Sequence, residues 1–333
     1  MKALFHHVID VVIDENGRYY PKRFTDKQIE ALGNLNEAFA VTGRCSTGMA
    51  LKCYTAADTV SFAYCVANQG SVGGFDVYEN GVLYHNELLP LEGRDSAVFT
   101  YTKETPGEVL LEIVFPSYAE MHLWDMNFGD WRPYDASNDK LVLWYGDSIT
   151  QATAVSTPSL TFPSLASRLC GMDYINRGIG SLYYDESFLD ENDPADPDFI
   201  MVEFGANDLV MHGPDKKLVY INDAVQFCSK DDVPMLMETA RAFLEKLKRI
   251  YPKAKIYVMS MLWACQDWSE LRIEANKAYH PALEKLVNEL GLNFIPGLDL
   301  MPHLKMVVID DRIHLSTIGC MAAAQSLAKY LRG

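Results

Sequence analysis

The sequence has no C-x-x-C pair, and its seven cysteines are an odd number. A disulfide framework uses an even set of cysteines, and metal sites use closely spaced pairs, so neither is indicated. Cys45, Cys53 and Cys65 come nearest to a metal site, but gaps of eight and twelve residues without paired histidines do not favour zinc. We therefore expect free thiols in a reducing compartment, no metal and no cofactor.

Long apolar runs and basic clusters are lacking as well. Histidines and acidic residues interrupt the first twenty positions, which leaves no signal-peptide core and no apolar stretch long enough to span a bilayer. Acidic residues outnumber basic ones by 45 to 29, for a net charge of -16. Such a charge repels phosphate backbones and anionic lipid head groups. We expect a cytoplasmic protein that binds neither nucleic acid nor membranes, and nothing indicates its oligomeric state.

The composition is that of a globular protein, with 49% hydrophobic and 22% charged residues, and 333 residues suit two domains. Thr25 and Gln28 resemble a capping box at the start of a short helix. Apolar and polar residues then alternate in several short runs, as in half-buried antiparallel strands. Asn80-Gly81 lies between two such runs and predicts a two-residue type I′ hairpin. Residues 1–135 are therefore predicted to form a β-sandwich.

Beyond a polar, turn-rich segment, residues 136–333 show a different rhythm. The predicted strands cover residues 141–145, 174–175, 199–204, 255–261 and 292–295, and the predicted helices cover residues 164–169, 236–250, 270–290 and 316–331. Pro281 is expected to kink or split the third of these helices. Strands that alternate with helices predict a three-layer, doubly wound parallel sheet. In such folds ligands bind beyond the carboxyl ends of the strands.

Residues of catalytic type stand where this architecture would place a site. A serine is a weak nucleophile unless a base, a group that orients the base and oxyanion donors surround it. Four blocks offer these parts, namely Gly146-Asp147-Ser148, Asn176-Arg-Gly178-Ile-Gly180-Ser181, Gly205-Ala-Asn207-Asp208 and Asp310-Asp311-Arg-Ile-His314. An aspartate three residues before a histidine can set the tautomer of the imidazole, which favours Asp311 over Asp310.

In order and approximate spacing, the four blocks resemble the SGNH (GDSL-type) hydrolase superfamily over about residues 141–333. The resemblance implies a flavodoxin-like sheet, with Ser148 as nucleophile, His314 as general base and acid, and Asp311 as its orienter. The oxyanion hole would use the backbone N–H of Ser148, an N–H of the second block and the side chain of Asn207. Ser181 occupies the position where the family has a glycine and Gly180 comes one residue earlier, so both remain candidate donors.

The first domain carries a shorter resemblance. Gly74-Phe-Asp-Val-Tyr78 is similar to the GxDLY motif of the β-sandwich that precedes some SGNH domains, and the layout resembles two-domain carbohydrate acetylesterases with a jelly-roll domain. A purely structural interpretation places Phe75 and Val77 in the sandwich core, Tyr78 on an edge and Asp76 on the solvent side.

The remaining candidates are less specific. We expect Asp147 to brace the turn before the serine. His212 and Trp263 are candidate substrate-binding residues, and Trp268 would lie near the same rim, although ordinary packing explains the aromatic residues equally well. The resulting hypothesis is a serine esterase that removes a short acyl group, acetyl in the first place, from a carbohydrate or another small hydroxyl compound. The alternatives are an acyltransferase with the same triad and a non-catalytic carbohydrate-binding protein.

Overall fold

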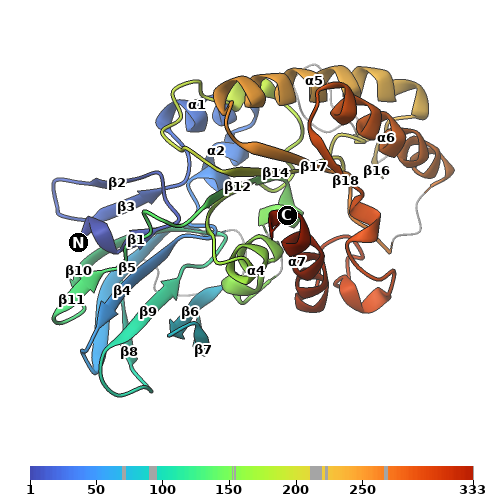
Figure 1. Cartoon of the computed structure of the whole chain (residues 1–333). Coiled ribbons are helices and arrows are strands. Elements are labelled where there is room, and N and C mark those ends of the chain that lie inside the picture. The colour runs from blue at the N-terminus through green and yellow to red at the C-terminus, as the bar shows by residue number, and fades with distance from the viewer. Residues whose placement is uncertain are drawn as a thin grey trace.

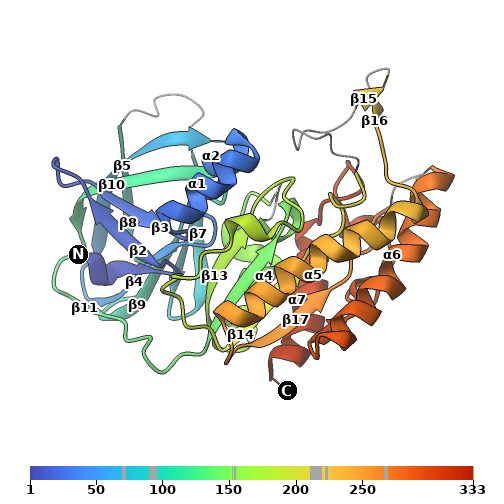
Figure 2. The same ribbon diagram turned by 90° about the horizontal axis from the view of Figure 1, so that it is seen from above.

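The computed structural model in Figure 1 shows two parts, a β-sandwich and a layered α/β part. The structure describes residues 1–69, 73–89, 96–151, 153, 155–210, 220–221, 224–265 and 269–332. Two antiparallel sheets pack face to face in the first part, and a parallel sheet with helices on both faces forms the second (Figures 1 and 2). The predicted fold class is confirmed.

In the described part of the sandwich all strand pairs are antiparallel, as its alternating sequence predicts. One sheet runs β1 (Phe5–His6), β4 (Ala50–Thr55), β9 (Val109–Val114), β6 (Gly74–Glu79) and β7 (Val82–Leu88), with β11 (Trp131–Pro133) also paired to β4. The other sheet runs β2 (Asp10–Ile13), β3 (Tyr19–Lys22), β10 (Ala119–Asn127), β5 (Thr59–Gln69) and β8 (Ala97–Thr102).

Aromatic side chains fill the space between these two sheets. The rings of Phe62 and Phe99 stack at 4.9 Å, and Phe75 meets Phe62 edge to face at 5.5 Å. All three rings are buried. At the predicted hairpin both central residues have positive φ, +50° for Asn80 and +82° for Gly81, which the type I′ turn requires.

The parallel sheet has the strand order β13-β12-β14-β17-β18, which is 2-1-3-4-5 when its own strands are counted along the chain. Its strands are β12 (Leu141–Gly146), β13 (Asp173–Gly178), β14 (Phe199–Glu203), β17 (Lys255–Met259) and β18 (Asn293–Ile295). The α-helices within the described residues are α1 (Asp26–Leu35), α2 (Glu37–Gly43), α3 (Ser148–Gln151), α4 (Phe162–Leu169), α5 (Val233–Ile250), α6 (Glu270–Glu289) and α7 (Thr317–Arg332). The order reverses between β12 and β14, and in such sheets ligands bind at this switch point, beyond the carboxyl ends of the strands.

Helices cover both faces of the sheet, α5 and α6 on one side and α4 and α7 on the other (Figure 1). The short hairpin of β15 (Tyr220–Ile221) and β16 (Ala224–Val225) projects from the α/β part in Figure 2. α6 continues through Pro281 as one helix, so the expected split is wrong. Tyr279 before the proline and Leu283 after it are buried in the same core, and this packing offsets the hydrogen bond that proline removes.

The two N-terminal helices pack on the α/β part, although they precede most of the sandwich strands (Figure 1). The predicted capping box is confirmed, because Thr25 Oγ1 accepts from Gln28 N at 3.1 Å and Gln28 Oε1 accepts from Thr25 N at 2.9 Å. Leu32 of α1 and Phe39 of α2 belong to the buried cluster that also contains α5 and α6. The predicted boundary between residues 135 and 136 falls in the connection from β11 to β12.

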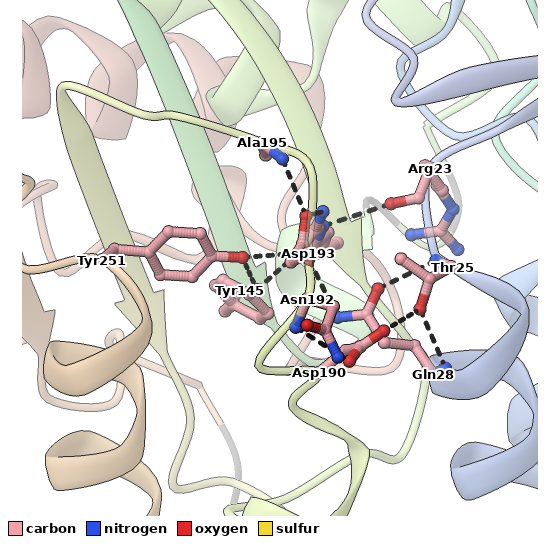
Figure 3. Close-up of polar contacts among 10 residues, drawn as sticks. Arg23, Thr25, Gln28, Tyr145, Asp190, Asn192, Asp193, Ala195 and Tyr251 are labelled. Carbon is pink, nitrogen blue, oxygen red and sulfur yellow. Dashed lines mark hydrogen bonds and ion pairs between the residues drawn. The ribbon is translucent and has the colours of Figure 1, made fainter.

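Buried arginines connect the two parts. Arg23 Nη1 donates to the carbonyl oxygens of Asn176 (2.9 Å) and Gly178 (2.8 Å), at the end of β13. Arg177, itself on β13, donates through Nε to the carbonyl of Arg23 at 3.1 Å and forms a fully buried ion pair with Asp193. Figure 3 shows this network, in which Thr25 and Gln28 of the N-terminal segment approach the loop around Asp193. The arginines thus fix the sandwich side of the chain to the strand beside β12.

Asp76 is fully buried, so its expected place on the solvent side is wrong. Its Oδ2 accepts from the N–H (2.8 Å) and the hydroxyl (2.6 Å) of Ser159, and the hydroxyl of Tyr78 donates to Ser159 Oγ at 2.8 Å. Ser159 belongs to the α/β part, which therefore covers this face of β6. Phe75 and Val77 lie in the sandwich core as expected.

Candidate active site

The serine lies directly beyond the carboxyl end of β12. Gly146 ends the strand, and a Cβ there would be 2.1 Å from Thr150 Oγ1 and 2.6 Å from the carbonyl oxygen of Glu203, so only glycine fits. Ser148 then begins α3. Asp147 Oδ1 accepts from the N–H of Ile149 at 2.8 Å and braces the turn, as expected. The local sequence thus presents a partly exposed hydroxyl at the first residue of a helix.

Ser148, His314 and Asp311 are connected by hydrogen bonds. Ser148 Oγ lies 2.7 Å from His314 Nε2, and His314 Nδ1 lies 2.5 Å from Asp311 Oδ2. The other carboxylate oxygen of Asp311 accepts from the backbone N–H groups of Ile313 and His314, both at 2.9 Å. The structure therefore brings together all three residues that the sequence predicts as nucleophile, base and orienter, and Asp311 contacts the ring as the spacing predicts.

The charge of Asp311 decides the tautomer of the imidazole. Partial burial alone would raise the pKa of Asp311, but the hydrogen bonds from the His314 ring and from the two backbone N–H groups lower it below its usual value. The carboxylate is therefore ionised at neutral pH and accepts a hydrogen bond from the N–H at Nδ1. This arrangement leaves Nε2 as an acceptor for the proton of the Ser148 hydroxyl.

The loop after β13 approaches the serine from one side. The N–H of Gly180 donates to Gln151 Oε1 at 2.7 Å. Ser181 has a φ of +66°, in the left-handed region that favours glycine, so the chain adopts a glycine-type conformation with a serine. In the described part of the chain the N–H of Ser181 donates to no group. Of the two candidate donors, the N–H of Gly180 is thus occupied and that of Ser181 is available.

Asn207 reaches the site from the end of β14. Gly205 precedes it with a φ of +131°, and a Cβ at Gly205 would lie 2.6 Å from Met261 Cγ, so the turn depends on glycine. Asn207 Nδ2 is 3.1 Å from Asp147 Oδ2 and 3.1 Å from the carbonyl oxygen of Leu182. The amide therefore lies between the serine turn and the second loop, where an incoming oxyanion would share its two N–H groups with these acceptors.

A cavity of about 760 Å³ opens beside Ser148 and His314. Its lining residues are Ser148, Ile149, Ser181, Ala206, Asn207, Val210, Val225, Phe227, Met261, Leu262, Trp263, Ala264, Arg272, Ile273, Asn276, Lys277, His280, Leu298, Ile313 and His314. Trp263 is among them and stacks on His303 at 5.2 Å, whereas His212 and Trp268 lie outside the described residues. The walls are mostly apolar, and the polar groups gather around the serine and along α6.

The model of the GDSL-like Lipase/Acylhydrolase family matches residues 144–321, which is more than half of the chain. The chain belongs to this family. The predicted membership of the SGNH superfamily is thereby confirmed. No curated protein matches the sequence.

Solved structures resemble this chain over both of its parts. The salicylyl-acyltransferase SsfX3 from a tetracycline biosynthetic pathway has a TM-score of 0.76 at 17% identity, covering 97% of this chain and 92% of that one. A family two carbohydrate esterase from Cellvibrio japonicus has a TM-score of 0.64 at 13% identity (97% and 92% covered). The family two carbohydrate esterase from Clostridium thermocellum in complex with cellohexaose has a TM-score of 0.63 at 12% identity (86% and 93% covered). At these identities the similarity shows a shared fold, a sandwich followed by an SGNH domain.

The sequence did not single out the residues with which α6 lines the cavity. Arg272, Asn276 and His280 are spaced by four residues and therefore lie on one face of the helix. That spacing can be read from the sequence, but it does not tell which face of the helix borders the site.

In the described part of the chain, no group of three or more His, Cys, Asp or Glu residues could hold a metal ion. None of the helices described here has the length and apolarity needed to cross a membrane.

Two buried carboxyl groups lie close to the turn that carries Ser148. Asp147 and Glu203 are both fully buried, and the hydroxyl of Thr150 donates to Glu203 Oε2 at 2.9 Å. Burial raises the pKa of Asp147 to about 7, and the nearby charge of Asp208 raises it as well. Burial and the charge of Asp147 raise the pKa of Glu203 well above its usual value. The pair therefore retains a proton at pH values where ordinary carboxyl groups are ionised.

We expect Glu203→Gln to gain stability relative to wild type as the pH rises from about 4.5 to about 8. The folded protein holds a proton on Glu203 that the unfolded chain releases in this range, so the contribution of Glu203 to the free energy of unfolding falls with rising pH. Glutamine removes this dependence. Urea unfolding at several pH values measures the difference, with Glu245→Gln on the exposed face of α5 as control. A difference that stays constant over the range would contradict the raised pKa.

Proposed function

We propose that this protein is a serine esterase in which Ser148 is the nucleophile, His314 the general base and acid, and Asp311 the residue that orients the imidazole. The observation that supports this assignment is the chain of hydrogen bonds from Ser148 Oγ to His314 Nε2 (2.7 Å) and from His314 Nδ1 to Asp311 Oδ2 (2.5 Å). Nucleophile, base and orienter stand in the order that acyl transfer to a serine requires.

Hydrolysis proceeds in two half-reactions. His314 Nε2 takes the proton of Ser148 as Oγ attacks the ester carbonyl, and it then gives this proton to the departing alcohol oxygen. Water loses a proton to the same nitrogen and attacks the acyl-enzyme; as the acid leaves, Nε2 returns this proton to Ser148 Oγ and restores the serine. The oxyanion accepts from the N–H groups of Ser148 and Ser181 and from the amide of Asn207. Each such donor contributes about 10²–10³-fold to turnover.

The cavity supports an ester with an apolar part. Its walls carry Phe227, Met261 and Leu262, and its volume of about 760 Å³ is larger than an acetyl group needs. An acyl or alcohol group that covers these side chains gains binding energy in proportion to the apolar area buried. O-acetylated carbohydrate stays a prediction, supported by the fold shared with family two carbohydrate esterases.

Acyl transfer is a second candidate function. It uses the same three residues, with an acceptor hydroxyl in place of water in the second half-reaction. The fold shared with the salicylyl-acyltransferase over 97% of the chain supports it, and so do apolar walls that limit access of water to the acyl-enzyme.

A panel of p-nitrophenyl esters tests the proposal. We expect turnover, with kcat/KM rising about threefold to fourfold per added methylene from acetate upward until the cavity is filled. O-acetylated sugars belong in the same panel, and product analysis with added alcohols separates hydrolysis from transfer. A maximum at acetate would contradict use of the cavity by the acyl group and favour acetylated sugars. Absence of turnover on every ester would contradict the esterase itself.

A further inference from the structure

The charged side chains that line the cavity beside Ser148 have one sign. They are Arg272 and Lys277, and no Asp or Glu stands among the described lining residues. In the chain as a whole acidic residues outnumber basic ones by 45 to 29. The walls next to the nucleophile thus carry the charge opposite to that of the protein, which favours an anionic ligand inside the cavity.

Arg272 places its charge within the wall of the cavity. The side chain is only 2% exposed, yet it lines the cavity, and its Nη2 donates to the carbonyl oxygen of Ala206 at 2.9 Å. The guanidinium carbon lies 4.8 Å from the centre of the Phe227 ring. Ala206 directly precedes Asn207. These contacts therefore fix the guanidinium beside the backbone that carries Asn207.

The surrounding groups leave this charge in place at neutral pH. Burial lowers the pKa of Arg272 to about 10, which still keeps the guanidinium protonated. Among the described residues Asp208 is the acidic group that faces it; burial raises the pKa of Asp208 to about 6, so this carboxyl group is mostly ionised at pH 7 and helps to keep the guanidinium protonated. Burial also raises the pKa of the Cys228 thiol, to about 11, so this neighbour is neutral.

The same face of α6 adds uncharged polar groups. Asn276 is one turn beyond Arg272, and its buried Oδ1 has no hydrogen-bond partner within the described part of the chain. His280 follows one turn later, and burial lowers its pKa, so its ring is neutral and can donate or accept. Lys277 is 70% exposed and forms a 3.3 Å ion pair with Glu274 outside the cavity. Arg272 is therefore the buried cation of this wall, and Asn276 and His280 extend the polar stripe.

We propose that the cavity binds an ester that carries a carboxylate, with Arg272 as the residue that pairs with this carboxylate. The inference rests on the proposed esterase function and narrows its substrate class. The apolar part of the substrate packs on Phe227 and Met261, and the planar guanidinium matches the geometry of a carboxylate. Hydrolysis at Ser148 then splits the substrate into an acid and an alcohol, one of which retains the additional carboxylate.

Two pairs of substrates test the proposal, because the carboxylate can belong to either side of the ester. In the first pair the p-nitrophenyl hemiester of glutaric acid is compared with the neutral ester in which an isopropyl group replaces the carboxylate. In the second pair para-acetoxybenzoate is compared with para-isopropylphenyl acetate. We expect wild type to prefer the anionic member of at least one pair by about tenfold or more in kcat/KM, because a charge-assisted hydrogen bond contributes that much.

Arg272→Met is expected to lower kcat/KM for the preferred anionic ester by about 10–100-fold more than for the neutral ester. Arg272→Lys keeps the charge and is expected to recover part of the preference. Lys285→Gln, a 79% exposed cation on the outer face of α6, is the matched control and should change neither ester. Equal losses on the anionic and the neutral ester in Arg272→Met would show that Arg272 only supports the Ala206 turn, and would overturn the proposal.

The outcomes separate this inference from the esterase function on which it rests. Turnover of the neutral esters without any preference for the anionic ones would overturn the carboxylate site and leave the esterase in place. If no ester is turned over, calorimetric titration of glutarate and benzoate into the Ser148→Ala and Ser148→Ala/Arg272→Met proteins tests the site alone. Weaker binding to the second protein supports the site, and equal binding or none to both overturns it.

Discussion

Ser148→Ala is expected to lower kcat for p-nitrophenyl esters by about 10⁴–10⁶-fold while the protein remains folded. Alanine removes the atom that forms the acyl-enzyme, and only the oxyanion donors and substrate binding then act on the uncatalysed attack of water. The fold is expected to tolerate the change because the hydroxyl is partly exposed and its hydrogen bond connects it to His314 at the surface of the site. Steady-state kinetics on the ester with the fastest wild-type turnover measures the loss.

The same experiment shows whether the serine and the imidazole act as one unit. His314→Ala is expected to lose nearly as much as Ser148→Ala, and the double variant no more than either, because each change abolishes the same nucleophile. His85→Ala, at a partly exposed histidine of the sandwich beside Glu87, is the control and should retain wild-type activity. Losses that multiply in the double variant would show that the two residues act independently and would contradict the triad. Circular dichroism of each variant confirms that the loss is catalytic.

The site could be predicted largely because its parts follow strands. β12 and β14 are buried apolar runs, and the polar residues after them had to meet at one edge of a parallel sheet. The three-residue spacing between Asp311 and His314 likewise identified Asp311 as the residue that contacts the imidazole. What the sequence could not tell is which N–H of the second loop is available. That depends on Gln151, whose side-chain oxygen accepts a hydrogen bond from the N–H of Gly180 and leaves the N–H of Ser181 available.

The errors in the fold arise from contacts between distant segments. The alternation on β6 correctly puts Asp76 on the face opposite Phe75, but it cannot tell that Ser159 of the other part covers that face. The capping box of α1 is a local signal and was predicted, whereas the packing of α1 on the core of the α/β part is not local. In the same way the periodicity of α6 defines a stripe, and only the folded chain shows that this stripe lines the cavity.

The ion pair between Arg177 and Asp193 is the contact between distant segments on which stability should depend most. Both side chains are fully buried, and the guanidinium also donates to the hydroxyls of Tyr145 (2.6 Å) and Tyr251 (3.1 Å), two residues that Figure 3 labels beside Asp193. Burial alone would raise the pKa of Asp193, and the charge of Arg177 lowers it below its usual value, so the carboxylate is ionised. Arg177 also contacts Arg23, so the pair supports the junction of the two parts.

Arg177→Met is expected to lower the free energy of unfolding by about 3–5 kcal/mol at neutral pH, because it leaves the Asp193 carboxylate buried without its cation. Part of this loss should disappear as the pH falls, since without Arg177 the folded-state pKa of Asp193 lies above the unfolded value and protonation restores stability. Arg177→Met/Asp193→Leu removes both charges and is expected to recover most of the loss. Arg249→Met removes an exposed pair with Glu191 on the same loop and is expected to have little effect. Urea unfolding of wild type and the three variants measures the differences. Two outcomes would contradict the prediction, namely a loss for Arg177→Met as small as that for Arg249→Met, or a double variant no more stable than Arg177→Met. Either would show that the unpaired Asp193 carboxylate does not cause the loss.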